Sequence, residues 1–213
     1  HPDLDDNMHT LGYDYQVAEP GGPGQGDPDL TCFRNSHGTE LAGIVAAEAN
    51  GQGAEGVGGN GVLVMPVRVG TYVDCDPKTL ELEIDYITDG MAWAAENEAD
   101  AINLSLSEPF SATNGIRLHQ WQSAINYARQ LETVVVATSG NQDLDTVNAP
   151  ARLPGAIAVG GTLSNDARWW EDLCKWRYPT EEWVCGSNYG RSLDIAAPAV
   201  WIHRTAMGGA DVY

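Results

Sequence analysis

Two polar residues stand at the ends of apolar segments, where they could do chemistry. His37 opens a predicted helix within the segment Asn35–Ala46, and Asn141 closes the segment Val134–Asn141. A histidine can take up a proton and return it, and a carboxamide can donate a hydrogen bond to an oxygen that gains negative charge. Taken alone, each has a simpler explanation, because a histidine at a helix start is usually a surface residue and an asparagine after glycine is usually in a turn. Whether they act together depends on the elements that carry them.

The elements around these residues alternate between helices and strands. Apolar residues at helical spacing predict three helices, at His37–Ala49, Leu80–Glu98 and Ile116–Leu131. Short apolar runs predict five strands, at Val62–Val69, Ala101–Ser105, Thr133–Thr138, Ala156–Gly160 and Leu193–Ala196. Residues 20–28 are rich in glycine and proline and predict a surface loop. The helix that begins at His37 carries small residues at 38, 42, 43 and 46, which allow another element to lie close to it.

Strands that alternate with helices in this way predict an α/β fold with a mostly parallel sheet covered on both faces. Right-handed crossovers then give a three-layer α/β/α sandwich. In such a sheet the reactive groups gather at the carboxyl ends of the strands. Because Asn141 lies only three residues after the end of a predicted strand, we expect its side chain at that edge.

Composition narrows the classes of partner. The chain has 213 residues, of which 43% are hydrophobic, and this predicts one domain over residues 1–213. Its net charge of -19 repels nucleic acid phosphates and anionic lipids, and no apolar run is long enough to cross a bilayer. We therefore expect no nucleic acid and no membrane partner, and we expect a monomer. No glycine-rich nucleotide motif follows a predicted strand, so we expect no organic cofactor.

The four cysteines leave two alternatives open. None of Cys32, Cys75, Cys174 and Cys185 belongs to a C-x-x-C pair, which argues against a zinc site. An even count in an exported protein predicts two disulfides, Cys174–Cys185 around a Trp-rich insertion and Cys32–Cys75. The alternative is four free thiols.

Six segments, in order, resemble the subtilisin-like serine proteases. Asn35–Ala46 matches the histidine motif H-G-T-x-x-A-G-x-x-A of that family, Ala101–Ser107 resembles its V-I-N-M-S-L-G strand, and Val134–Asn141 resembles its V-V-V-A-A-A-G-N strand. The remaining matches are His1–Leu4 (H-P-D-L), Ala156–Gly161 and Ser187–Pro198. The chain is therefore similar to a large central piece of the peptidase domain, incomplete at both ends. Ala199 stands where the family usually has glycine.

The resemblance implies a role for each matching residue. His37 would be the general base and Asn141 the side-chain donor of the oxyanion hole. Ser105, Leu106 and Ser107 would pair with the substrate backbone. One wall of the primary specificity pocket would be formed by Ala137, Thr138, Ser139 and Gly140, whose small size suggests a pocket for a large apolar side chain. The substrate would be a polypeptide, and the protein would be extracellular.

A calcium site is a further implication of the resemblance. Asn50–Val57 resembles the loop that holds calcium in the family. The match makes the Asn50 side chain and the carbonyls of Gln52 and Ala54 ligands, together with Asp3. Oxygen ligands of this kind suit calcium better than zinc. The alternative is a glycine-rich turn without a metal.

Two motifs of the family, for the catalytic aspartate and for the serine nucleophile, have no counterpart in these 213 residues. The parent domain is therefore expected to be a serine endopeptidase, while the isolated chain is expected to be inactive and poorly stable. Two alternatives remain: a binding module of the same family without catalysis, and an α/β enzyme acting on a small molecule. The absence of nucleotide motifs argues against the second alternative.

Overall fold

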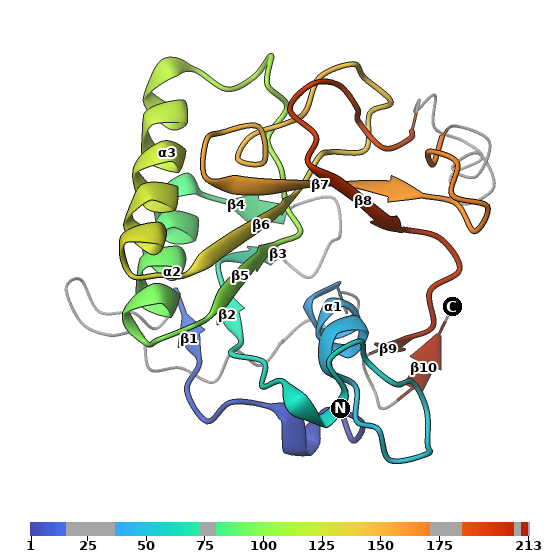
Figure 1. Ribbon diagram of the computed structural model, residues 1–213. Coiled ribbons are helices and arrows are strands. Elements are labelled where there is room, and N and C mark those ends of the chain that lie inside the picture. Colours follow the sequence, from blue (N-terminus) through green and yellow to red (C-terminus); the bar gives the residue numbers. More distant parts are fainter. Residues whose placement is uncertain (16–36, 73–79, 171–184, 207–209, 213) are drawn as a thin grey trace. The chain divides into compact units, whose positions relative to one another are not determined.

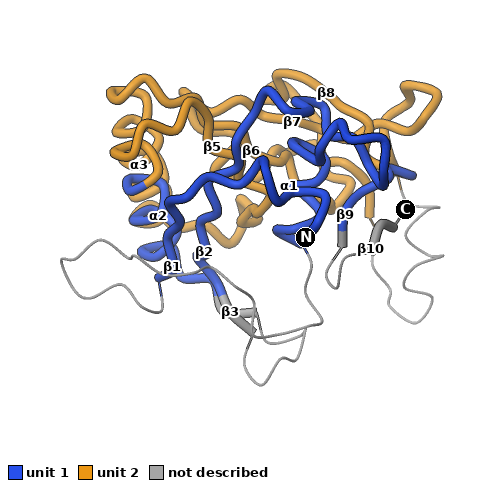
Figure 2. Tube along the Cα trace, turned by 90° about the horizontal axis from the view of Figure 1, so that it is seen from below, with its two compact units in different colours: residues 1–93, 201–213 blue, residues 94–200 orange. Residues whose placement is uncertain are grey.

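The computed structural model describes residues 1–15, 37–72, 80–170, 185–206 and 210–212. The chain forms two compact units, shown in different colours in Figure 2. Unit 1 contains His1–Trp93 and Trp201–Tyr213, and unit 2 contains Ala94–Val200. One domain over residues 1–213 stays a prediction.

A four-stranded parallel sheet forms the centre of unit 2 (Figure 1). Its strands lie in the order β5 (Ala101–Leu104), β6 (Val134–Thr138), β7 (Ala156–Thr162) and β8 (Ile195–Pro198). The predicted parallel sheet of an α/β fold is therefore confirmed. β8 begins two residues later than predicted, and the Asp194 carboxylate before it accepts the Ala158 backbone N–H at 2.8 Å, in the place of a backbone carbonyl.

Helix α3 (Gly115–Gln130) packs against this sheet. The helix begins where Asn114 accepts the Arg117 backbone N–H at 3.0 Å, as a capping residue does. Trp121, Ile125 and Ala128 are fully buried on its inner side. Burying each large apolar side chain contributes about 1.5–3 kcal/mol, so packing of this one face accounts for most of the stability of the helix.

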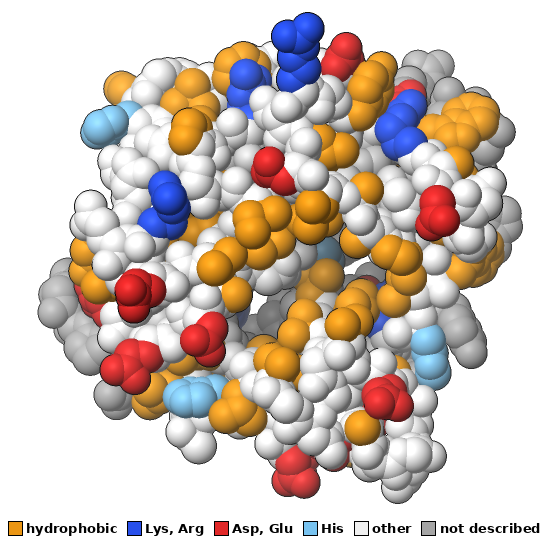
Figure 3. Space-filling model, viewed as in Figure 1, with side chains coloured by type: hydrophobic (Ala, Val, Ile, Leu, Met, Phe, Trp, Pro, Cys, Tyr) orange, Lys and Arg blue, Asp and Glu red, His pale blue; other side chains and the backbone are white. Residues whose placement is uncertain are grey.

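Several residues of this sheet are exposed. Val134 is 44% exposed and Ile195 is 55% exposed, and all four residues of β8 are exposed. Figure 3 shows hydrophobic side chains gathered over the strands of this sheet. β8 forms one edge of this four-stranded sheet.

In unit 1, helix α1 (His37–Ala46) packs against strand β9 (Arg204–Ala206). Thr205 donates a hydrogen bond from Oγ1 to the Thr39 carbonyl oxygen at 2.7 Å, and Arg204 pairs with Glu40 at 2.9 Å. Strand β10 (Ala210–Val212) pairs antiparallel with β9. The small residues of α1 thus have the predicted consequence, since Gly43 is buried directly against Thr205.

The remaining elements of unit 1 are short. β1 (Tyr13–Asp14) pairs parallel with β2 (Val67–Arg68), and β3 (Gly70–Tyr72) pairs antiparallel with β4 (Leu80–Leu82). Two 3-10 turns lie at η1 (Asp5–Asn7) and η2 (Gly59–Gly61). Helix α2 (Ile84–Glu96) buries Ile84, Ile87 and Met91, and its last three residues belong to unit 2.

Three predicted boundaries are wrong in unit 1. The segment Leu80–Leu82 is a strand rather than the start of a helix, because it pairs with β3. The helix at His37 ends at Ala46 instead of Ala49, since the Glu48 N–H turns away and donates to the Asp3 carbonyl oxygen at 2.9 Å. Only Val67–Arg68 of the predicted strand Val62–Val69 is paired as a strand, and Leu63 is 58% exposed.

Replacing Gly43 with alanine is expected to destabilise the protein. A Cβ at this position would lie 2.8 Å from Cγ2 of Thr205 and closer still to Oγ1. Overpacking of this kind costs about 1–3 kcal/mol. Gly38 on the same helix is the matched control, because a Cβ there would meet nothing within 4 Å. Chemical denaturation should show a clear loss for G43A and a change of less than about 1 kcal/mol for G38A; equal effects would contradict the close contact.

Candidate active site

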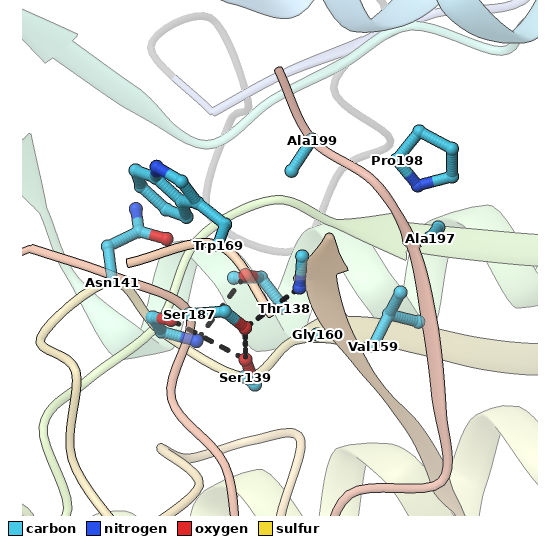
Figure 4. A pocket seen from close by; sticks show the side chains of 12 residues that line it. Thr138, Ser139, Asn141, Val159, Gly160, Trp169, Ser187, Ala197, Pro198 and Ala199 are labelled. Atoms are coloured by element: carbon cyan, nitrogen blue, oxygen red, sulfur yellow. Dashed lines mark hydrogen bonds between the residues drawn. The ribbon is translucent and has the colours of Figure 1, made fainter. Parts of the chain in front are cut away.

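A cavity of about 180 Å³ lies at the carboxyl ends of the strands of unit 2. Its walls come from Thr138–Asn141 at the end of β6, from Val159–Gly161 on β7 and from Ala197–Ala199 at the end of β8. Trp169 and Ser187 complete the described lining (Figure 4). The cavity thus occupies the edge at which reactive groups gather in parallel sheets.

The loop that carries Asn141 begins at the buried Ser139 and reaches the surface at Asn141. Ser139 is 1% exposed, and its N–H donates to the Val159 carbonyl oxygen at 2.9 Å, as a continuation of β6. Gly140 then takes φ +103°, a conformation that favours glycine. This turn places Asn141 at the exposed end of the loop, with its side chain at the cavity.

Asn188 holds this loop in place from a second segment. Its side chain is fully buried, and its Oδ1 accepts the N–H groups of Gln142 at 3.0 Å and Leu144 at 3.1 Å. Its Nδ2 donates to the Ser139 carbonyl oxygen at 3.1 Å. The backbone on both sides of Asn141 is therefore bonded to one buried amide. Sequence reasoning matched the segment that contains Asn188 but assigned this residue no role.

Two serines brace the inner wall of the cavity. Ser187 accepts the Gly161 N–H at its Oγ at 2.8 Å, and the Oγ atoms of Ser139 and Ser187 lie 3.3 Å apart. Both residues are buried. Their hydroxyls are thus engaged with each other and with the backbone, which fits a supporting role in the wall.

The predicted substrate-binding residues divide into two groups. Thr138, Ser139 and Gly140 line the cavity, whereas Ala137 is buried within the sheet. Ser105, Leu106 and Ser107 follow β5, which ends at Leu104, and are not among the described residues that line the cavity.

Asn148 links the segment Ser105–Ser107 to the loop that carries Asn141. Its Nδ2 donates to the Ser107 Oγ at 3.1 Å and to the Gln142 Oε1 at 3.0 Å. The two predicted binding segments are therefore neighbours. Their pairing with a substrate stays a prediction.

His37 is exposed as the first residue of α1. It belongs to unit 1, while Asn141 belongs to unit 2. The observed start of α1 at His37 confirms the predicted start of this helix. That His37 and Asn141 face one substrate stays a prediction.

The four residues predicted to bind calcium converge within unit 1. Asp3 is buried, and its carboxylate accepts the Ala54 N–H at 3.0 Å and the Asn50 Nδ2 at 3.3 Å. Asn50 Oδ1 accepts the Gln52 N–H at 2.8 Å. For this side chain to serve as an oxygen ligand, its amide has to turn so that Oδ1 faces Asp3.

Glu48 is a second buried acid at this place, and sequence reasoning missed it. Its carboxylate accepts the Asn50 Nδ2 at 3.3 Å and the Asp6 N–H at 2.9 Å. Neither Asp3 nor Glu48 forms an ion pair with a described residue, although burying a charge without a counterion is costly. The donor set fits an oxygen-seeking cation in kind. No group of three or more His, Cys, Asp or Glu side chains that could hold a metal occurs among the described residues, so carbonyl oxygens would have to complete the set.

Cys185 is buried and forms a disulfide. This excludes the alternative of four free thiols. Cys32, Cys75 and Cys174 lie outside the described residues, as does the predicted loop 20–28, so the pairing itself stays a prediction. In the same described part of the chain, none of the helices has the length and apolar character needed to cross a membrane.

Comparison with known proteins agrees with the fold. The family model described as "Subtilase family" matches residues 1–210. The alkaline protease of Alkalihalobacillus alcalophilus is 32% identical over 183 residues, which are 86% of this chain and 40% of that protein. The thermophilic serine proteinase of Bacillus sp. (strain AK1) is 33% identical over 221 residues, covering 100% of this chain and 44% of that protein. The chain thus spans less than half the length of these two relatives.

Solved structures show the same fold. The nisin leader peptidase NisP from Lactococcus lactis has a TM-score of 0.69 at 22% identity, with 100% of this chain and 68% of that chain covered. Sphericase has a TM-score of 0.68 at 22% identity, and the match covers 100% of this chain and 66% of the sphericase chain. The family match extends over nearly the whole described chain, and the asparagine at the end of β6 lies at a cavity. The chain therefore belongs to the subtilase family.

Proposed function

We propose that the protein carrying this chain is a serine endopeptidase that hydrolyses peptide bonds through an acyl-enzyme. The observation that carries the proposal is the position of Asn141, which lines a cavity at the carboxyl end of β6 on a loop held by the buried Asn188. Such a loop keeps a hydrogen-bond donor in place before the reaction begins, which is the requirement for an oxyanion hole. Membership of the subtilase family supports the same chemistry.

In the proposed reaction, a serine attacks the carbonyl carbon of the substrate and His37 takes the proton of the hydroxyl. The side-chain N–H of Asn141 donates to the oxygen that becomes negative. His37 then returns the proton to the leaving amine, and water releases the acyl group by the same two steps. The serine, and the aspartate that orients the imidazole, would come from segments outside these 213 residues.

The uncharged cavity lining and the net charge of the chain support the proposed substrate and the proposed extracellular location. The described residues that line the cavity carry no charge, which suits a neutral stretch of polypeptide. A net charge of -19 suits an extracellular, soluble and monomeric protein.

The test compares two proteins. One is the longest protein that the surrounding coding sequence encodes, and the other is the 213-residue chain. We expect the longer protein to cleave a peptide substrate and to react with a serine-directed phosphonate, whereas the 213-residue chain should do neither. Both activities should disappear in the His37→Ala variant of the longer protein. A folded longer protein without cleavage or labelling would instead favour the binding module.

Calcium is proposed as a structural cofactor at Asp3, Asn50, Gln52 and Ala54, with Glu48 as an additional acid. When bound, the cation would neutralise the buried carboxylates and join the N-terminal segment to the loop after α1. The support is the burial of both acids without an ion pair to a described residue.

Saturating calcium is expected to raise the melting temperature. A ligand at 100 times its Kd stabilises by about 2.7 kcal/mol, which corresponds to about 5–10 °C for a chain of this size. Asp3→Asn should remove most of this shift, whereas Asp5→Asn, which changes an exposed neighbour, should preserve it. Differential scanning calorimetry with calcium and with a chelator measures both. An unchanged melting temperature in the starting chain would remove the calcium site from the proposal.

A further inference from the structure

The indole N–H of Trp169 is a feature of the cavity that the reaction above does not use. Trp169 lines the cavity together with Asn141. Its Nε1 atom is buried without a hydrogen-bond partner, and among the described residues it is the only buried side-chain nitrogen or oxygen in that condition. A buried tryptophan N–H normally finds an acceptor, because leaving it without one costs free energy. An acceptor that enters the cavity would remove this cost.

The position of the indole is fixed by its surroundings. The Trp169 N–H donates to the Gly161 carbonyl oxygen at 2.9 Å, and the Trp169 carbonyl oxygen accepts the Ser187 N–H at 2.8 Å. The ring lies against β7 at Gly161, where an added Cβ would be 3.6 Å from Cε3 of the indole. The indole is therefore held by backbone bonds on both sides and by contact with a strand, so its N–H has a defined place.

Figure 4 shows the indole of Trp169 next to the carboxamide of Asn141. Asn141 is exposed, and its side chain has no hydrogen-bond partner among the described residues. Two neighbouring N–H donors at one wall of the cavity thus have no acceptor among the described protein residues. Since the described lining contains no charged side chain, these donors suit a neutral amide carbonyl better than a carboxylate or a phosphate.

We propose that the Trp169 indole N–H donates a hydrogen bond to a backbone carbonyl oxygen of the polypeptide that occupies this cavity. Trp169 then helps to hold the bound chain beside Asn141. This inference rests on the proposed function, because it takes the ligand of the cavity to be a polypeptide.

The test measures binding to the unchanged chain and to two variants. The probe is an acetylated and amidated tetrapeptide of alanine and leucine, titrated while the indole N–H resonances of the seven tryptophans are recorded by NMR. Trp169→Phe keeps an aromatic ring and removes the donor. Trp170→Phe is the matched control, since Trp170 is 47% exposed and is not among the described residues that line the cavity.

We expect the Trp169 indole proton to move downfield on binding, and we expect W169F to raise the Kd about threefold to tenfold, as the loss of one neutral hydrogen bond does. W170F should leave the Kd unchanged. Binding with an unmoved Trp169 proton and an unchanged Kd in W169F would overturn the inference and leave the proposed function standing. Failure of the peptide to bind the unchanged chain would overturn the inference as well, whereas the proposed function is judged separately by cleavage and labelling of the longer protein.

The test does not depend on folding of W169F. Single phenylalanine variants at the six other tryptophans assign the other resonances, so that Trp169 is identified by elimination. The movement of its indole proton in the unchanged chain then decides the outcome.

Discussion

Replacing Gly140 with alanine is expected to destabilise unit 2 by about 3–5 kcal/mol. The first cause is the backbone, since φ at this position is +103° and a residue with a side chain is strained there by about 1–3 kcal/mol. The second is space. A Cβ would lie 2.5 Å from Nδ2 of Asn188 and 2.8 Å from Cγ of Asn148, and such overpacking costs about 1–3 kcal/mol more.

Chemical denaturation followed by circular dichroism measures this loss. Gly51→Ala is the control for backbone strain alone, because Gly51 has φ +78° and a Cβ there would meet nothing within 4 Å. G51A should cost about 1–2 kcal/mol. If G140A were no more destabilising than G51A, the tight placement of the two amides around this turn would be wrong.

The expected loss is large because Asn188 and Asn148 cannot move apart freely. Asn188 bonds the backbone of Ser139, Gln142 and Leu144, and Asn148 is bonded to the Ser107 hydroxyl. Shifting either amide would leave buried polar groups without partners, which adds about 1–3 kcal/mol for each group. A single methyl group would thus disturb both segments that meet beside Asn141.

The central sheet was predictable because each strand shows its character locally. The run Val134–Val136 is β-branched and apolar, and it is followed at once by small residues that end the strand. Ala101–Leu104 and Ala156–Thr162 are similar in kind. By contrast, β4 and β9 are three residues long and are strands only because of partners elsewhere in the chain. Local propensity cannot identify such elements.

In the candidate site, too, only the residue with a local sequence signal was predictable. Asn141 stood out because a strand, a glycine and an amide follow one another, and the structure places it at a cavity. Asn188 did not stand out, since its role depends on a contact with residues more than 40 positions earlier. Trp169 was missed for a similar reason, because the absence of a partner for an indole N–H becomes visible only when the folded surroundings are known.

Replacing Asn141 with alanine is expected to lower the turnover number of the longer protein about 100-fold to 1,000-fold. This magnitude was established on a subtilisin and is carried over to this chain through its family. The physical reason is that, in the proposed reaction, the carboxamide donates to an oxygen that is negative only during the reaction. The loss should therefore fall on kcat, with little change in KM.

Asn126→Ala is the matched control for this measurement, because Asn126 is an exposed asparagine on α3 whose Oδ1 accepts from Gln122 Nε2 at 3.0 Å. Steady-state kinetics on a peptide substrate should leave that variant unchanged. The same assay separates the two donors at the cavity wall. Trp169, as proposed, bonds a carbonyl that is already present in the bound substrate, so W169F should act mainly on KM. A fall in kcat for W169F as large as that for N141A would mean that the indole also serves the oxyanion, whereas an unchanged kcat in N141A would remove Asn141 from the reaction.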